Sequence, residues 1–74
     1  MKQADPQATR RVLARRVRAL RKGLGLTQEE LAAQVGLRQA QISELESASN
    51  NIKIDNLHRL AAALGVRPHE LLDD

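Results

Sequence analysis

The sequence lacks several residue types on which small functional domains often depend. None of its 74 residues is a cysteine, which excludes disulfides, thiolate metal sites and a cysteine nucleophile. Small secreted domains usually need disulfides, so this absence favours the reducing cytoplasm. Phenylalanine, tyrosine and tryptophan are also absent. Their absence argues against the single-strand binding folds, which stack bases on aromatic rings.

Long apolar runs and an N-terminal targeting signal are missing as well. No hydrophobic segment approaches the ~20 residues of a membrane span. The first six residues are polar, which is not typical of a signal peptide. A chain of this length is expected to form a single domain, residues 1–74, with room for only a modest core. We therefore expect a cytoplasmic domain without a membrane contact.

Basic and acidic residues are unevenly distributed along the chain. The formal net charge is +3. Residues 1–22 hold eight Lys or Arg and one Asp, a net charge of +7, whereas residues 23–74 hold four basic and eight acidic residues, a net charge of −4. The basic segment favours a polyanionic partner. The acidic remainder keeps a protein partner open as an alternative.

Helix-forming residues dominate, and no segment alternates polar and apolar residues. Asp5 followed by Pro6 is typical of a helix start. Thr27 and Glu30 have the spacing of a capping box. We predict an all-α, compact five-helix fold, with helices at residues 6–22, 27–35, 39–47, 54–64 and 68–72.

The second and third predicted helices form a compact pair. They are separated by about three residues centred on Gly36, which can turn the chain. The later helix has only Ile42 and Leu45 as large apolar residues, so its other side is small and polar. A surface built for protein packing would more often carry Leu, Met or aromatic residues. A helix with this polar side suits the DNA major groove, which is roughly 12 Å wide.

Several runs of the sequence together resemble a known family. Apolar, small and glycine residues occur in a specific order in the runs Arg18–Arg21, Gly25–Ala32, Val35–Leu37, Ile42–Glu46 and Leu60–Val66. Residues 18–72 thereby resemble the lambda-repressor-like (Cro/repressor, Xre-type) helix-turn-helix DNA-binding domain. Residues 1–17 are expected to be a basic extension of the first helix. The resemblance implies that the second and third helices form the helix-turn-helix.

The resemblance also implies roles for individual residues. The candidate base-reading residues are Arg38, Gln39, Ala40, Ser43 and Glu44. The candidate phosphate contacts are Gln28, Gln41, Asn50, Asn51 and Lys53. Phosphate contacts position a protein on DNA, whereas base contacts specify the sequence. Arg21 and Glu46 match an Arg–Glu pair of the family and are expected to form a structural ion pair.

The sequence departs from the family pattern in three places. Arg38 stands where the family usually has a Ser or Thr cap, so this cap is expected to be weak. Glu44 is acidic where a basic residue or Gln is common, and it can accept only from a donor such as cytosine N4. The glycine that commonly follows the recognition helix is absent. The segment Asn51–Ile54 is similar to the controller proteins of restriction-modification systems.

Other polar residues have simpler interpretations. The basic residues of the first helix are interpreted as a solvated face, with direct phosphate contact as the alternative; they are Arg11, Arg15, Arg18 and Lys22. His58 and His69 are expected to lie on the surface, because neither has Cys or clustered acidic partners. No nucleophile–base pair, Gly-rich phosphate loop or metal cluster is evident, so we expect no enzyme activity, cofactor, metal or small-molecule ligand.

The leading interpretation is a sequence-specific regulator of transcription. It would bind a palindromic operator in double-stranded DNA as a homodimer, with half-sites about 34 Å apart. Candidate dimer contacts near the C-terminus, by the same resemblance, are Ile52, Val66, Leu71 and Leu72. The alternative is a protein-binding module, such as an antitoxin that uses the same fold to hold a toxin.

Overall fold

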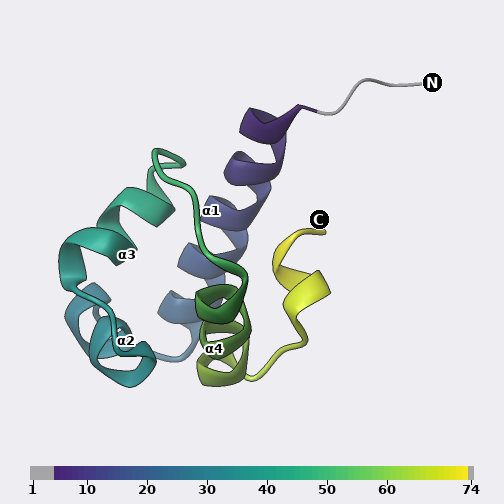
Figure 1. Ribbon diagram of the computed structural model, residues 1–74. Coiled ribbons are helices and arrows are strands. Elements are labelled where there is room, and N and C mark those ends of the chain that lie inside the picture. Colours follow the sequence, from purple (N-terminus) through teal and green to yellow (C-terminus); the bar gives the residue numbers. More distant parts are fainter. Residues whose placement is uncertain (1–4, 74) are drawn as a thin grey trace.

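The computed structural model describes residues 5–73, which form four α-helices and a short 3-10 helix (Figure 1). This part of the chain contains no strand, as expected for an all-α fold. Residues 6–17 of the predicted basic extension belong to the first helix. Residues 1–4 of that extension lie outside the described part. The elements are α1 (Pro6–Gly23), α2 (Gln28–Val35), α3 (Gln39–Glu46), α4 (Ile54–Leu64) and the 3-10 helix η1 (Pro68–Leu71).

The prediction of a fifth α-helix at residues 68–72 is wrong. This segment is the 3-10 helix η1, in which Glu70 N–H donates to the Arg67 carbonyl at 2.9 Å and Leu72 N–H donates to the His69 carbonyl at 3.0 Å. Such i→i+3 bonds are typical of segments too short to complete α-helical turns.

Local sequence explains where the first two helices begin. Asp5 Oδ1 accepts a hydrogen bond from Gln7 N–H at 3.1 Å and caps α1. The predicted capping box of α2 is confirmed, because Thr27 Oγ1 accepts from Glu30 N–H at 3.0 Å and Glu30 Oε1 accepts from Thr27 N–H at 2.9 Å. These bonds, led by the one from the Thr27 backbone, lower the pKa of Glu30.

The core is built from one apolar side of each helix. Its largest fully buried side chains come from α1, α2, α3, α4 and η1, and they are Val17, Leu31, Ile42, Leu60 and Leu71. The core therefore depends on every element, including the short η1. None of the helices within residues 5–73 is long and apolar enough to cross a membrane.

The pair α2 and α3 lies on one side of the molecule, with α1 and α4 packed against it (Figure 1). Ala32 is buried where the two helices approach each other, and its small side chain allows a close crossing. Gly36 has a φ of 78°, a left-handed conformation that glycine adopts without a steric penalty. Leu37 N–H then returns to the Ala32 carbonyl at 2.9 Å. This turn directs α3 across α2.

Candidate nucleic-acid interface

The outer side of α3 is polar and open to solvent, as the sequence predicted. Ile42 and Leu45 anchor the opposite side and are buried in the core. This leaves one continuous exposed surface of small and polar side chains. The exposed residues on this helix and its N-cap include all five base-reading candidates, Arg38, Gln39, Ala40, Ser43 and Glu44.

The start of α3 has a cap that the sequence analysis missed. Arg38 has no side-chain acceptor and makes no side-chain cap, in agreement with the weak cap expected there. Gln41 compensates, because its Oε1 accepts from the Arg38 backbone N–H at 2.9 Å. The Oε1 of Gln41 is therefore engaged within the protein, and only its Nε2 group is available to a phosphate.

The end of α3 contains a backbone feature in place of the usual glycine. Ala48 N–H donates to the Leu45 carbonyl at 3.1 Å, and Ser49 N–H donates to the Glu44 carbonyl at 3.0 Å. These two bonds form a Schellman motif, which requires a left-handed residue at its turn. Ala48 fills that position with a φ of 59°. A residue with a Cβ is strained there by roughly 1–2 kcal/mol.

Arg21 and Glu46 form the ion pair that the family resemblance implied. Arg21 Nε lies 2.6 Å from Glu46 Oε2, and Arg21 Nη2 lies 2.9 Å from Glu46 Oε1. The side chains are only 11% and 4% exposed. Arg21 Nη1 also donates to the Leu26 carbonyl at 2.8 Å. The guanidinium thus joins α1, the turn before α2 and the end of α3.

The electrostatics of this pair favour its ionised form. Burial by itself raises the pKa of Glu46, but hydrogen bonds from Arg21 and Gln28 outweigh it, and the net shift is downward. The hydrogen bond to Glu46 raises the pKa of Arg21, although burial opposes it. Both groups therefore remain charged across the neutral range.

Two glutamines extend this pair to the surface. Gln28 Nε2 donates to Glu46 Oε1 at 3.2 Å, and Gln39 Nε2 donates to Gln28 Oε1 at 2.9 Å. Gln28 and Gln39 were predicted from the sequence to have separate roles, and their contact was not foreseen. Both are the first residue of their helix, a position that does not by itself indicate a contact between them. The chain of bonds fixes the orientation of both amides.

The loop after α3 holds the remaining phosphate candidates. Lys53 and Asn51 are exposed, whereas Asn50 turns inward and its Nδ2 donates to the Gln41 carbonyl at 3.5 Å. Asn50 Oδ1 is buried without a hydrogen-bond partner in the described part of the chain. Asn50 is therefore placed less favourably for a phosphate than its two neighbours.

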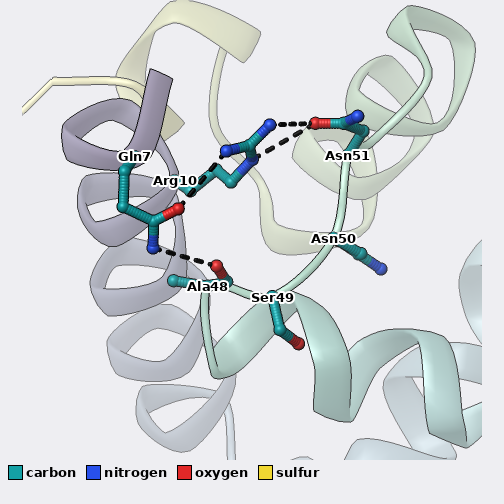
Figure 2. Close-up of a pocket in the computed structure, with 6 residues that line it drawn as sticks. All are labelled: Gln7, Arg10, Ala48, Ser49, Asn50 and Asn51. Carbon is teal, nitrogen blue, oxygen red and sulfur yellow. Dashed lines mark hydrogen bonds between the residues drawn. The ribbon is translucent and has the colours of Figure 1, made fainter. Parts of the chain in front are cut away.

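A polar cavity of about 300 Å³ lies between this loop and the first turns of α1 (Figure 2). Two α1 side chains reach across it to the loop, a contact that sequence analysis missed. The residues that line the cavity are Gln7, Arg10, Ala48, Ser49, Asn50 and Asn51.

The basic face of α1 is exposed, as expected for a solvated face. Its exposed residues are Arg11, Arg15, Arg18 and Lys22. Arg11 lies 3.9 Å from the Asp5 carboxylate, a contact worth little at such exposure. Arg16, outside that set, donates to the Glu70 carbonyl at 3.0 Å and ties α1 to η1.

The dimer candidates differ in how much surface they offer. Ile52 and Val66 are half-buried, and Leu72 is 40% exposed. Leu71 is 0% exposed and packs in the core of its own chain, so it has no surface to offer a partner. Ile54 was not among the predicted dimer contacts, yet it is 75% exposed. Its position at the first turn of α4 gave no sign in the sequence of the direction in which its side chain points.

The two histidines are both exposed. Within residues 5–73, no three His, Cys, Asp or Glu side chains come together as a metal site would require.

Comparison with known proteins relates this geometry to a family. Residues 17–71 match the helix-turn-helix family HTH_3. A hypothetical transcription factor from Neisseria meningitidis serogroup B is 44% identical over 68 residues, which cover 92% of this chain and 64% of that protein. The chain thus spans less than two thirds of the length of this relative.

Solved structures show the same similarity. The restriction-modification controller protein C.AhdI from Aeromonas hydrophila has a TM-score of 0.80 at 35% identity, covering 84% of this chain and 94% of that chain. The DNA-binding domain of the P22 c2 repressor has a TM-score of 0.78 at 35% identity, covering 81% and 79%. The chain belongs to the helix-turn-helix family of Xre-type, lambda-repressor-like proteins.

Proposed function

We propose that this protein is a sequence-specific regulator of transcription that binds double-stranded DNA with α3 in the major groove. The observation that carries the proposal is the solvent-facing polar side of α3, whose orientation is fixed by the buried Arg21–Glu46 pair. The relatives support it, since they are described as a hypothetical transcription factor, a restriction-modification controller protein and a DNA-binding domain. None of these descriptions is that of an enzyme.

The base contacts come from the exposed side of α3. Gln39 donates through Nε2 to Gln28, so its Oε1 and remaining N–H are available to a base edge. Glu44 accepts only, which favours a cytosine N4 donor at its position. Ala40 and Ser43 are small and allow close approach to the groove. Arg38 at the N-cap completes the set.

The phosphate contacts flank α3 at both ends. Gln28 and Gln41 lie near its N-terminal end, and each keeps its amide oriented through a bond within the protein. Asn51 and Lys53 lie beyond its C-terminal end. We assign Asn50 the weakest of these contacts, because its Nδ2 already donates to the Gln41 carbonyl.

We further propose that the protein binds as a homodimer, because one α3 reads only a few base pairs. Two copies related by a two-fold axis would read a palindrome with half-sites about 34 Å apart. The apolar candidates for this contact are Ile52, Ile54, Val66 and Leu72, each at least partly exposed. Leu71 is left out because it is buried.

Selection of binding sites from a random pool of double-stranded DNA tests the proposal. At near-physiological salt, the wild-type protein is expected to enrich a palindrome. The double variant Ser43→Ala, Glu44→Ala is the control for base reading. Both residues are exposed, so their loss should leave the thermal unfolding midpoint nearly unchanged, and a changed or lost consensus would come from the missing base contacts. No enrichment by a folded wild-type protein would contradict the proposal and favour the protein-binding alternative.

A further inference from the structure

The first turns of α1 reach the loop that follows α3, and we propose that Arg10 positions Asn51 as a phosphate donor. The inference rests on the proposed function, since it assigns a positioning residue to that DNA-binding surface. Arg10 and Gln7, which together we name the α1 latch, both lie before residues 17–71, the part that matches the family.

Three side-chain contacts make up the latch (Figure 2). Gln7 Nε2 donates to the Ala48 carbonyl at 3.2 Å. Arg10 Nη1 donates to Gln7 Oε1 at 3.3 Å, which holds the two latch side chains together. The Arg10 guanidinium donates to Asn51 Oδ1 through Nε at 3.2 Å and also through Nη2. The Arg10 guanidinium therefore binds two side chains, those of Gln7 and Asn51.

Beyond the Schellman bonds of Ala48 and Ser49, the loop at the far end of the latch has few backbone hydrogen bonds of its own. Ala48 holds an unfavourable left-handed conformation. The backbone N–H groups of residues 50–53 donate no backbone hydrogen bond within the described part of the chain. Asn50 adds one long side-chain bond, of 3.5 Å, to the Gln41 carbonyl. Ile52 packs against the core and the Ser49 hydroxyl donates to the Glu44 carbonyl, and the contacts from α1 add the hydrogen bonds to Ala48 and Asn51.

The chemistry of the Arg10–Asn51 contact determines which end of the amide is available. An asparagine amide has an acceptor oxygen and a donor nitrogen, whereas a guanidinium only donates and a phosphate only accepts. Arg10 therefore binds Oδ1 and leaves Nδ2 as the outward group of this exposed side chain, on the side away from Arg10 (Figure 2). Without Arg10, the amide could rotate and present its oxygen to the phosphate.

A double-mutant cycle on the selected DNA site tests this inference. We expect Arg10→Ala and Asn51→Ala each to weaken binding about tenfold, as for loss of one hydrogen bond to a charged group. The double variant should be no more than about twofold weaker than Asn51→Ala, because Arg10 acts through Asn51. Arg10→Lys should recover part of the affinity, since lysine can donate one bond to Oδ1.

Salt dependence separates positioning from direct contact. A residue that neutralises one phosphate contributes about −0.9 to the slope of log K against log salt. Arg10→Ala is expected to leave this slope unchanged. The matched control is Arg11→Ala, which removes the same charge from the same helix without touching the loop, and it should change affinity less than about threefold. A slope shallower by about 0.9 for Arg10→Ala, or an additive double variant, would overturn the inference.

A measurement without DNA keeps the latch separate from the proposed function. In Arg10→Ala, the NMR signals of the Asn51 side-chain amide should shift, and hydrogen exchange of the hydrogen-bonded backbone amides of Ala48 and Ser49 should become faster. Unchanged signals and exchange rates would overturn the latch whether or not DNA binds. If the folded wild-type protein bound no DNA, the proposed function and the phosphate role of Asn51 would fail, and these signals would still decide the latch.

Discussion

Arg21 and Glu46 join the end of α1 to the end of α3 through two parallel hydrogen bonds of 2.6 and 2.9 Å in an almost solvent-free site. A buried ion pair contributes little net stability compared with an apolar pair of the same shape, but removal of one partner leaves an uncompensated charge. The pair therefore fixes the position of α3 relative to α1. Gln28 binds Glu46 and Gln39 binds Gln28, so this fixed geometry extends to the protein surface.

Glu46→Ala is expected to destabilise the fold by about 3 kcal/mol, because Arg21 would remain buried and unpaired. Urea unfolding followed by circular dichroism measures this change. Arg11→Ala is the control, since Arg11 is exposed on the same helix as Arg21 and its loss should change the free energy of unfolding by less than about 0.5 kcal/mol. An unfolding midpoint unchanged by Glu46→Ala would count against the pair.

The same pair predicts an acid-sensitive fold. The pKa of Glu46 is lower in the folded protein than its ordinary value of 4.5. A lowered folded pKa contributes stability above the unfolded pKa, and this contribution is lost as the pH falls through the folded value. The free energy of unfolding should therefore decrease from about pH 4.5 downward, and less steeply in Glu46→Gln. Parallel curves for the two proteins between pH 6 and pH 3 would show that Glu46 is not the group responsible.

Ala48→Gly should stabilise the protein by about 0.5–1 kcal/mol. The substitution removes the left-handed strain of Ala48 and gives back part of that gain through the greater freedom of glycine in the unfolded chain. Thermal unfolding should show a midpoint higher by roughly 2–8 °C. The reverse change, Gly36→Ala, at a φ of 78°, should lower the midpoint by a similar amount. A lower midpoint for Ala48→Gly would contradict this reading of the loop.

Gln28→Ala should weaken DNA binding by about tenfold or more, because it removes one of the proposed phosphate donors and releases Gln39 from its fixed orientation. Fluorescence anisotropy with the selected site measures the loss. The discrimination against base changes at the position read by Gln39 should fall as well. If affinity fell while that discrimination stayed intact, the Gln28–Gln39 bond would have no part in base reading.

Much of the fold was predictable because its signals are local. Asp5 and the Thr27–Glu30 capping box define the starts of α1 and α2 by contacts within three residues. The apolar spacing of Ile42 and Leu45 predicted which side of α3 is buried. The segment at residues 68–72 was misassigned, since five residues after a turn carry too little periodicity to separate a 3-10 helix from an α-helix.

The contacts between distant residues were not predictable from local pattern. Gln7 and Arg10 meet a loop about forty residues further along the chain, and nothing in their own neighbourhood indicates it. The Gln28–Gln39 bond depends on the angle at which α2 and α3 cross. The Arg21–Glu46 pair was expected only because the family resemblance supplied it. Burial of Leu71 follows from how η1 packs on α1 and α4.

The central claim is that the exposed side of α3 reads bases, and it is tested most directly by repeating the DNA selection with Glu44→Ala. Wild-type protein and variant should enrich the same palindrome, except that the variant loses its preference at one symmetric position in each half-site, where the wild type selects the base pair whose donor meets Glu44. The same consensus at every position from a folded variant would contradict base reading by Glu44 on α3.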